Sequence, residues 1–307
     1  MKFFGRTKTK KVIGNRKMAS TLLIIDPQKD FHPGGTLAID KADEDSERIA
    51  SLIRNSTEKD GRGSTIERIF VTLDTHHKLH IGHPCFWVNV DGNHPEPFTL
   101  ISSADVESGL WIPRGNLHIP DGMVDKDIFD GGFNIDGSFD LKKHCVQYTK
   151  SVEKSGHFKH CIWPEHCLLG SPGHNVVDVI RIALDDWVAS TGRSVVWVCK
   201  GQNLLSENYS ALSAEVPVSR ATEFDNSLYQ SLQLSNRLLI CGQALSHCVN
   251  YTARDIVKKW PPAEMSKICI LTNCASNVTG FESAGDNFLK DMKKSGVRLC
   301  LDSNAFD

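Results

Sequence analysis

The chain has 307 residues and a formal charge of −2 at pH 7, with 40% hydrophobic and 23% charged residues. This balance is typical of a soluble globular protein with one large domain or two small ones, and it gives no reason to expect nucleic acid as a partner. No apolar run approaches the ~20 residues of a membrane-spanning helix, so we do not expect a membrane as a partner either.

Residues 1–19 form a basic opening segment. The stretch MKFFGRTKTKKVIGNRKMA holds seven Lys and Arg residues and no acid. We predict a disordered tail here, because such a composition has little apolar surface to bury. An upstream extension with Met18 as the start is an alternative. An organelle transit sequence is another, although the segment is poor in serine and lacks a clear amphipathic period.

From residue 20 onward, short apolar runs alternate with segments of helical periodicity. Each run is nearly continuous, which is typical of strands buried on both faces. The alternation predicts an α/β fold with a doubly wound, mainly parallel sheet of about six strands and helices on both faces. The expected strands are Leu22–Ile25, Ile69–Thr72, Ser194–Cys199, Leu238–Cys241, Ile268–Leu271 and Val297–Leu301. The expected helices lie at 42–55, 175–190, 244–260 and 281–296.

Residues 84–160 lack this rhythm. They are rich in Gly, Pro, His and Asp, and they show one expected helix at 140–156. A segment of this length without regular alternation indicates an insertion of irregular structure, acting as a lid or a small subdomain.

Chemically capable side chains follow four of the expected strands. Asp26 follows the first, Asp74 the second and Lys200 the third, and the loop that begins at Gly242 delivers Cys248 to the start of a helix. Ligands of open α/β sheets bind outside the carboxyl ends of the strands, so we expect these residues at one rim. Each residue alone is commonly a turn, solvent-facing or packed residue. Their joint occurrence is what indicates a site.

A cysteine at the start of a helix can act as a nucleophile. The free N–H groups and the macrodipole of the helix favour its thiolate, and a nearby lysine adds positive charge. An aspartate can take the thiol proton and return it to a leaving group. Backbone N–H groups of the loop after Gly242 can face a developing oxyanion. The alternative is that Cys248 is one more packed thiol.

The other cysteines indicate a reducing compartment. The chain has ten, scattered without the Cys-x2-Cys spacing of structural zinc sites. Cys199, Cys241 and Cys269 lie in apolar runs, which is typical of small buried residues. We therefore expect no disulfides, and we expect a cytoplasmic protein.

A second constellation contains potential metal ligands. Asp74 and His76 alternate along an extended chain end, which places a carboxylate and an imidazole on one side. With His166, which follows Trp-Pro, they would make an open divalent-metal site. The stretch LDTHHKLHIGHP holds four histidines, of which we expect two to be spare: His76, His77, His80 and His83. The alternative is a polar, partly exposed histidine-rich loop.

Five blocks of the sequence resemble, in the same order, the motifs of the nicotinamidases of the isochorismatase-like cysteine hydrolase superfamily: IIDPQKDFHPGGTLAI, LDTHH, WPEHC, CKGQN with ENYSAL, and CGQALSHCV. The resemblance covers roughly residues 20–83 and 160–300. It implies an isochorismatase-like three-layer sandwich over 20–307, with an insertion at about 84–160. It also implies a metal-assisted amidohydrolase of NAD salvage that releases ammonia from nicotinamide or a similar small carboxamide.

The resemblance implies a role for each matching residue. Asp26, Lys200 and Cys248 would form the triad, with a thioester on Cys248 that water then hydrolyses. Asp74, His76 and His166 would hold the metal, with zinc as the first candidate and iron or manganese as the others. The substrate contacts would be Phe31, Trp163 and Tyr209. The oxyanion hole would use the N–H groups of Ala244 and Cys248, next to a cis Gln243–Ala244 peptide.

The chain also departs from the family pattern. His76 and His166 are separated by ninety positions. Gly82 stands where some members have a further ligand histidine, which leaves His80 or His83 as its substitute. The insertion next to the metal motif is expected to cover the pocket.

Three alternatives stay open at this stage. The first is a hydrolase of the same fold that acts on isochorismate or a carbamoyl compound. The second is a metal-activated water with a merely packed Cys248. The third is a non-catalytic ligand-binding protein. The chain is also a candidate for homo-oligomer formation.

Overall fold

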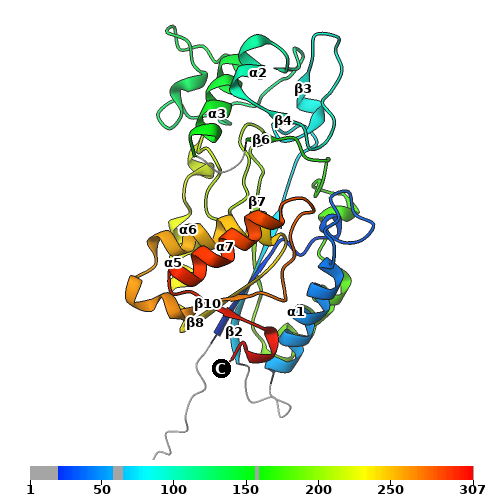
Figure 1. Ribbon diagram of the computed structural model, residues 1–307, viewed down its shortest axis with the longest axis vertical. Coiled ribbons are helices and arrows are strands. Elements are labelled where there is room, and N and C mark those ends of the chain that lie inside the picture. The colour runs from blue at the N-terminus through cyan, green and yellow to red at the C-terminus, as the bar shows by residue number, and fades with distance from the viewer. Residues whose placement is uncertain (1–19, 58–64, 156–158, 307) are drawn as a thin grey trace, which may run out of the picture.

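The computed structural model describes residues 20–57, 65–155 and 159–306 (Figure 1). The predicted tail at 1–19 lies outside the described residues. A six-stranded parallel sheet forms the centre, which confirms the predicted α/β fold. Its strands are β1 (Ser20–Ile25), β2 (Ile66–Asp74), β7 (Val196–Lys200), β8 (Arg237–Gly242), β9 (Ile268–Leu271) and β10 (Arg298–Cys300).

The strand order places a ligand crevice between β1 and β8. The order across the sheet is β10-β9-β8-β1-β2-β7, so the winding direction reverses between these two strands. They pair in parallel, with Ile25 opposite Gly242. Because ligands of such sheets bind outside the carboxyl ends at the switch point, the residues that follow Ile25 and Gly242 flank the expected crevice.

Helices cover both faces of the sheet (Figure 1). On one face lie α1 (Ala42–Ser56) and α4 (Asp178–Thr191), whose buried side chains join one apolar cluster with those of the strands. On the other lie α5 (Asn226–Gln233), α6 (Asn250–Lys259) and α7 (Glu282–Lys294). The sequence pattern missed α5, since eight residues give too little periodicity to recognise. The Asp225 side chain begins this helix by accepting the N–H groups of Ser227 and Leu228.

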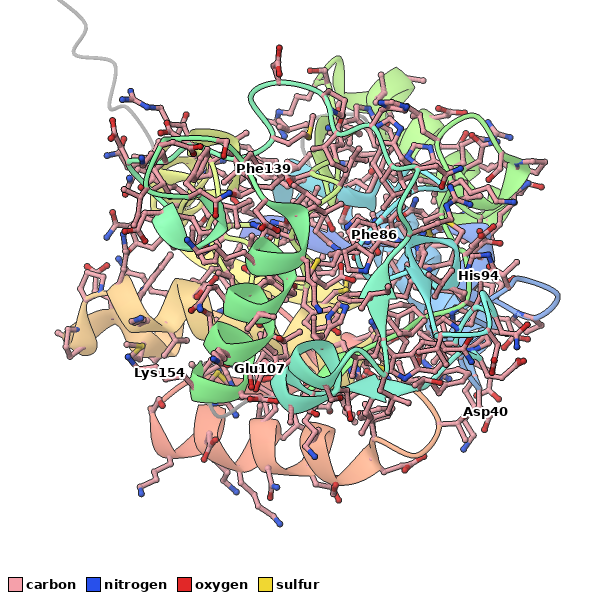
Figure 2. All side chains as sticks on the ribbon, turned by 90° about the horizontal axis from the view of Figure 1, so that it is seen from above. Asp40, Phe86, His94, Glu107, Phe139 and Lys154 are labelled. Atoms are coloured by element: carbon pink, nitrogen blue, oxygen red, sulfur yellow. A yellow bond between two sulfur atoms is a disulfide. The ribbon has the colours of Figure 1, made fainter. Side chains whose placement is uncertain are left out.

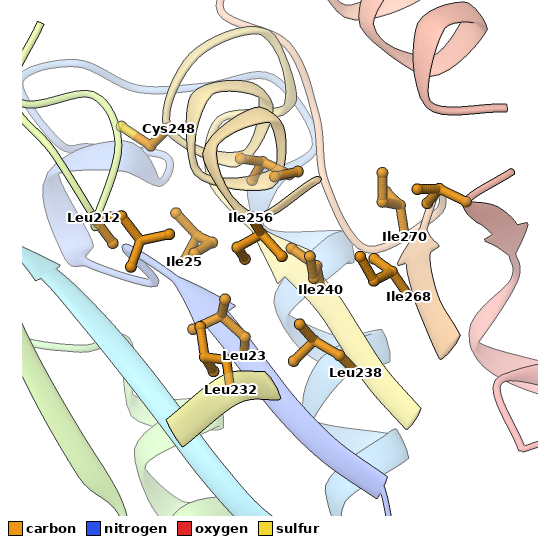
Figure 3. Packing of buried hydrophobic residues seen from close by; sticks show 14 of the residues in the cluster. Leu23, Ile25, Leu212, Leu232, Leu238, Ile240, Cys248, Ile256, Ile268 and Ile270 are labelled. Atoms are coloured by element: carbon orange, nitrogen blue, oxygen red, sulfur yellow. The ribbon is translucent and has the colours of Figure 1, made fainter. Parts of the chain in front are cut away.

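The apolar cluster beneath α6 reaches the functional edge of the sheet. Figure 3 shows Ile25 and Ile240 from neighbouring strands below Ile256 of α6. Each such buried side chain contributes roughly 1.5–3 kcal/mol to the free energy of folding. Cys248 borders this cluster near Leu212 (Figure 3). Hydrophobic packing thus holds the backbone of Cys248 on a rigid support.

Two predictions about cysteines are wrong. Cys199 is exposed, as is Trp197 at 49%, because β7 is an edge strand that no other described strand covers on its outer side. Cys269 is disulfide-bonded to Cys300 on the adjacent strand. Their Cα atoms lie 6.3 Å apart, within the reach of a disulfide. Only the sheet order reveals that β9 and β10 are neighbours.

The inserted segment is more regular than predicted and lies above the sheet (Figure 1). Its fully buried Phe86, Trp87 and Tyr148 share one apolar cluster with Leu205 and Val218 of the segment that follows β7. Figure 2 looks down on the inserted segment, with Phe86 beneath its loops and Glu107 and Lys154 at one end of its helices. The predicted helix is present as α3. The elements are β3 (Trp87–Val88), β4 (Leu100–Ile101), α2 (Ser103–Ser108), β5 (Ile112–Pro113), α3 (Leu141–Ser155) and β6 (His160–Cys161).

The length and polarity of a helix decide whether it can cross a membrane. Among the helices of the described residues, none is both long enough and apolar enough to cross a membrane. The longest, α1 and α3, have 15 residues each and carry charged side chains along one side.

Candidate active site

The sheet brings Asp26, Lys200 and Cys248 together. Lys200 Nζ lies 3.0 Å from Asp26 Oδ2 and 3.6 Å from Cys248 Sγ. The ammonium also donates to the carbonyl oxygen of Asn208 at 2.9 Å. All three predicted residues are buried. They therefore form a connected polar group at the carboxyl edge, as their positions after β1, β7 and β8 predicted.

Asp26 is held by its neighbour Thr72. The Asp26 N–H donates to Thr72 Oγ1 at 3.0 Å, and the Thr72 hydroxyl donates to Asp26 Oδ1 at 2.5 Å. Asp26 has a φ of +43°, an uncommon conformation for a residue with a side chain. These bonds aim the second carboxylate oxygen, Oδ2, at Lys200.

The loop before Cys248 turns sharply at Gly242. This residue has a φ of +110°, and a Cβ there would lie 2.1 Å from the Ile25 carbonyl oxygen, so only glycine fits. The Gln243–Ala244 peptide is cis, as the resemblance implies. A π-helical turn, Leu245–Val249, then runs directly into α6 and carries Cys248. Such turns are frequent at functional sites.

Electrostatics place a neutral thiol beside a charged lysine. Burial raises the pKa of Cys248 well above its usual value, and the Lys200 charge opposes this only in part. Burial also works against protonation of Lys200, but Asp26 and Asp74 outweigh it and raise the lysine pKa. Burial raises the pKa of Asp26 as well, which makes it a stronger base. A thiolate at Cys248 would therefore need transfer of the thiol proton to a base.

Asp74, His76 and His166 meet at the same edge. Asp74 Oδ2 lies 3.1 Å from His76 Nε2 and 3.3 Å from His166 Nε2. The separation of ninety positions along the chain does not keep the two histidines apart, because His76 forms a parallel bridge with Leu168. Gln28 fixes the backbone of Asp74 by accepting its N–H and donating to its carbonyl oxygen, both at 2.7 Å.

Hydrogen bonds select the nitrogen that each of these histidines presents. Nδ1 of His76 lies 3.2 Å from the Gly201 carbonyl oxygen, and Nδ1 of His166 lies 2.7 Å from that of Pro164. A carbonyl accepts a hydrogen bond only from a protonated nitrogen, so Nδ1 carries a proton in both rings and Nε2 is the nitrogen that faces Asp74. His76 Nε2 has no hydrogen-bond partner among the described residues. A carboxylate and two imidazoles oriented in this way fit a divalent cation.

The remaining histidines of the motif differ in the partners of their ring nitrogens. His83 Nδ1 lies 3.2 Å from the Lys78 carbonyl oxygen, and its buried Nε2 has no partner among the described residues. Both nitrogens of His80 meet backbone groups, the N–H of Gly82 and the carbonyl of Ser206. His77 is exposed. His83, whose ring lies 5.1 Å from that of His76, is therefore the better additional ligand.

Lys200 connects the two halves of the site. Its Nζ lies 3.0 Å from Asp74 Oδ1 as well as 3.0 Å from Asp26 Oδ2. Burial disfavours ionised Asp74, but His76 and Lys200 outweigh it and hold the pKa of this carboxyl well below its usual value. The thiol and the candidate metal ligands are thus parts of one charge network.

A cavity opens onto both halves. The predicted contacts Phe31, Trp163 and Tyr209 line it, and the Trp163 indole N–H donates to Tyr209 Oη at 3.0 Å. Asp74, His166, Ala244 and Cys248 also line this cavity. Residues of the predicted triad, metal set and aromatic contacts thus border one shared space.

The insertion does not cover this cavity in the way that the sequence suggested. Within the described part of 84–160, no residue lines it. The insertion instead supports its wall, since the Phe98 ring lies edge-on, 5.9 Å from that of Trp163.

Sequence reasoning missed Glu207 and His247, which also line the cavity. Glu207 lies in the ENYSAL block and His247 directly precedes Cys248, so proximity to the motifs was the available signal. Burial lowers the pKa of His247 to about 3, and its imidazole packs edge-on against Trp163 at 5.1 Å. The cavity wall at this point is therefore a neutral ring.

Comparisons by sequence and by structure give different results for this chain. No protein-family model matches the chain, and no curated protein sequence matches it significantly. Solved structures of nicotinamidases, however, share its fold over nearly the whole chain. The chain has the isochorismatase-like α/β fold of these structures.

Three of these structures illustrate the likeness. A nicotinamidase and pyrazinamidase from Acinetobacter baumanii is 16% identical, with 95% of this chain and 99% of that chain covered and a TM-score of 0.57. The yeast nicotinamidase is 21% identical, with 92% and 99% covered and a TM-score of 0.57. A protein from L. infantum, solved in complex with nicotinate, is 18% identical, with 94% and 95% covered and a TM-score of 0.53.

Proposed function

We propose that the protein is a metal-assisted cysteine amidohydrolase that releases ammonia from nicotinamide, giving nicotinate, or from a similar small carboxamide. The observation that carries the proposal is the shared cavity, because the Cys248 thiol and the histidine–aspartate cluster open onto the same aromatic-walled space. A pyridine ring suits such walls, and its nitrogen is a good ligand for a borderline-soft cation. The nicotinamidase structures of the same fold support this substrate class.

The metal would be held by Asp74, His76 and His166, with His83 as the additional ligand. These side chains offer one carboxylate oxygen and imidazole nitrogens already oriented by backbone carbonyls, which suits zinc. A pyrazinamidase from Pyrococcus horikoshii of the same fold was solved in complex with zinc. When bound, the cation supplies a Lewis acid that positions the ring of the substrate.

The residues of this chain perform the bond-making steps. Asp26 takes the proton of Cys248 while the sulfur attacks the amide carbon, and Lys200 remains protonated beside both groups. The N–H groups of Ala244 and Cys248 receive the developing oxyanion. The carbon–nitrogen bond then breaks, and Asp26 returns the proton to the departing ammonia. Water next attacks the thioester, gives its proton to Asp26 and releases the acid, and Cys248 regains its proton.

A direct test is ammonia release by the purified protein from nicotinamide and from benzamide, which lacks the ring nitrogen. We expect nicotinamide to have the higher kcat/KM, because only its ring can reach the metal through nitrogen. Equal rates would remove the metal from substrate binding. Turnover of isochorismate or a carbamoyl compound, with none of nicotinamide, would support the alternative hydrolase instead.

Metal removal should abolish activity reversibly. We expect dialysis against a chelator to lower the metal content and ammonia release together, and zinc to restore both. Replacing His166 with alanine should weaken metal affinity by about 100-fold or more, since even outer-shell changes cost 10–100-fold. Metal content by mass spectrometry provides the readout. His77→Ala is the matched control, because its side chain is exposed, and full activity of metal-free protein would contradict the proposal.

A further inference from the structure

Glu207 is a buried acid that the steps above do not use. Its side chain is only 5% exposed, and it lines the same cavity. Oε1 accepts the N–H of Asn208 at 3.0 Å, but Oε2 has no hydrogen-bond partner among the described residues. A carboxylate withdrawn from water is costly unless donors or a cation meet it. The position of this group therefore requires an explanation.

The carboxylate faces the histidine cluster. Oε1 lies 3.9 Å from His76 Nε2, and Oε2 lies 4.0 Å from His80 Nδ1. These distances exceed those of hydrogen bonds. Two donor atoms that each lie about 2.0–2.2 Å from the same zinc ion are at most about 4.4 Å apart. The 3.9 Å distance between His76 Nε2 and Glu207 Oε1 is therefore short enough for both atoms to meet one cation.

The balance of buried charges also favours a cation beside Glu207. In their ionised forms, Asp26, Asp74 and Glu207 carry three negative charges in one buried region. Lys200, the only lysine or arginine that the structure pairs with Asp26 or Asp74 among the described residues, carries one positive charge. A divalent cation supplies the missing two. Without Glu207, the loaded site would instead hold an excess of positive charge.

Gly82 creates the space that Glu207 occupies. A Cβ at position 82 would lie 2.4 Å from Glu207 Oε2. Its backbone φ lies outside the left-handed region, so the absence of a side chain, rather than backbone freedom, is what this position provides. Any larger residue at position 82 would displace the carboxylate from the histidines.

We infer that Glu207 is a further carboxylate of the metal site, admitted by the absence of a side chain at Gly82, and that it increases the affinity for a divalent cation. This inference rests on the metal part of the proposed function and is independent of its substrate.

The test is zinc affinity, measured by competition between the metal-free protein and a chromophoric chelator. We expect Glu207→Gln and Gly82→Ala each to weaken zinc binding by about 10–100-fold. Glu165→Gln is the control for the acid, because Glu165 pairs with exposed Lys78. Gly115→Ala is the control for the glycine, because a Cβ there meets nothing within 4 Å. Both controls should bind zinc like the wild type.

A double variant tests the link between the two residues. Once Glu207→Ala has removed the carboxylate, the methyl group of Gly82→Ala has room. The double variant should therefore bind zinc no more weakly than Glu207→Ala alone. Additive losses would overturn the role of Gly82.

Thermal unfolding separates a metal role from a merely structural one. The metal-free Glu207→Gln protein should have a Tm equal to or above that of the wild type, while its zinc-induced rise in Tm should be smaller. A lower metal-free Tm with an unchanged zinc-induced rise would overturn the inference, as would wild-type protein that binds no zinc. Zinc binding that depends on Glu207, in a protein that releases no ammonia, would uphold it and reject the amidase.

Discussion

Replacing Cys248 with alanine should lower kcat for ammonia release by about 10⁴-fold or more, the scale seen when a catalytic nucleophile is removed. No other thiol lines the cavity among the described residues. Lys200 and Asp26 remain beside the mutated position in this variant. Neither of them can form the carbon–sulfur bond that the thiol forms. The measurement is single-turnover and steady-state ammonia release at saturating nicotinamide.

The control for this variant is Cys199→Ala, since Cys199 is exposed at the edge of the sheet and should be dispensable. Cys248→Ala should retain its zinc, because the thiol meets Lys200 and makes no hydrogen bond to Asp74, His76 or His166 among the described residues. If the variant kept both its zinc and its rate, a metal-activated water would be the nucleophile and Cys248 only a packed residue.

Replacing Lys200 with methionine should both inactivate and destabilise the protein. The ammonium lies 3.0 Å from carboxylates of both Asp26 and Asp74, and it is buried with them. Removing one partner of a buried charge pair leaves an uncompensated charge and costs about 3–5 kcal/mol. Denaturant unfolding of the metal-free proteins measures this loss as a lower free energy of unfolding.

Two companion variants sharpen this prediction. Lys258→Met changes an exposed lysine on α6 and should alter stability by no more than about 0.5 kcal/mol. Adding Asp26→Asn to Lys200→Met removes one of the stranded carboxylates, so the double variant should recover part of the lost stability. A Lys200→Met protein as stable as the wild type would show that the ammonium does not hold this network together.

Sequence pattern alone predicted the sheet well and its surroundings less well. All six predicted strands are present, because burial on both faces demands nearly continuous apolar runs. The same rule failed at β7, whose apolar Trp197 is half exposed, since the pattern does not say which strand lies at the edge. It also overlooked α2, a helix of six residues that begins with a capping box at Ser102.

The candidate site, too, could be predicted from the sequence only in part. The convergence of Asp26, Asp74, Lys200 and Cys248 was predicted from residue type and position, because strand ends of a parallel sheet meet at one edge. The triad roles and the aromatic contacts were predicted only from the family resemblance. The sequence could not decide whether His80 or His83 is the better additional metal ligand, since this depends on which backbone groups meet each ring nitrogen. The sequence could not predict the raised pKa of Cys248 either, since this depends on burial by distant segments.

The sequence by itself determined the α/β class, the order of the strands along the chain and the polar residues at their ends, because these follow from local apolar runs and the residues next to them. Only the tertiary structure decided the pairing of Cys269 with Cys300 and the fit of Glu207 beside Gly82. These contacts join segments far apart in the chain. They arise from sheet order and packing, which no local pattern encodes.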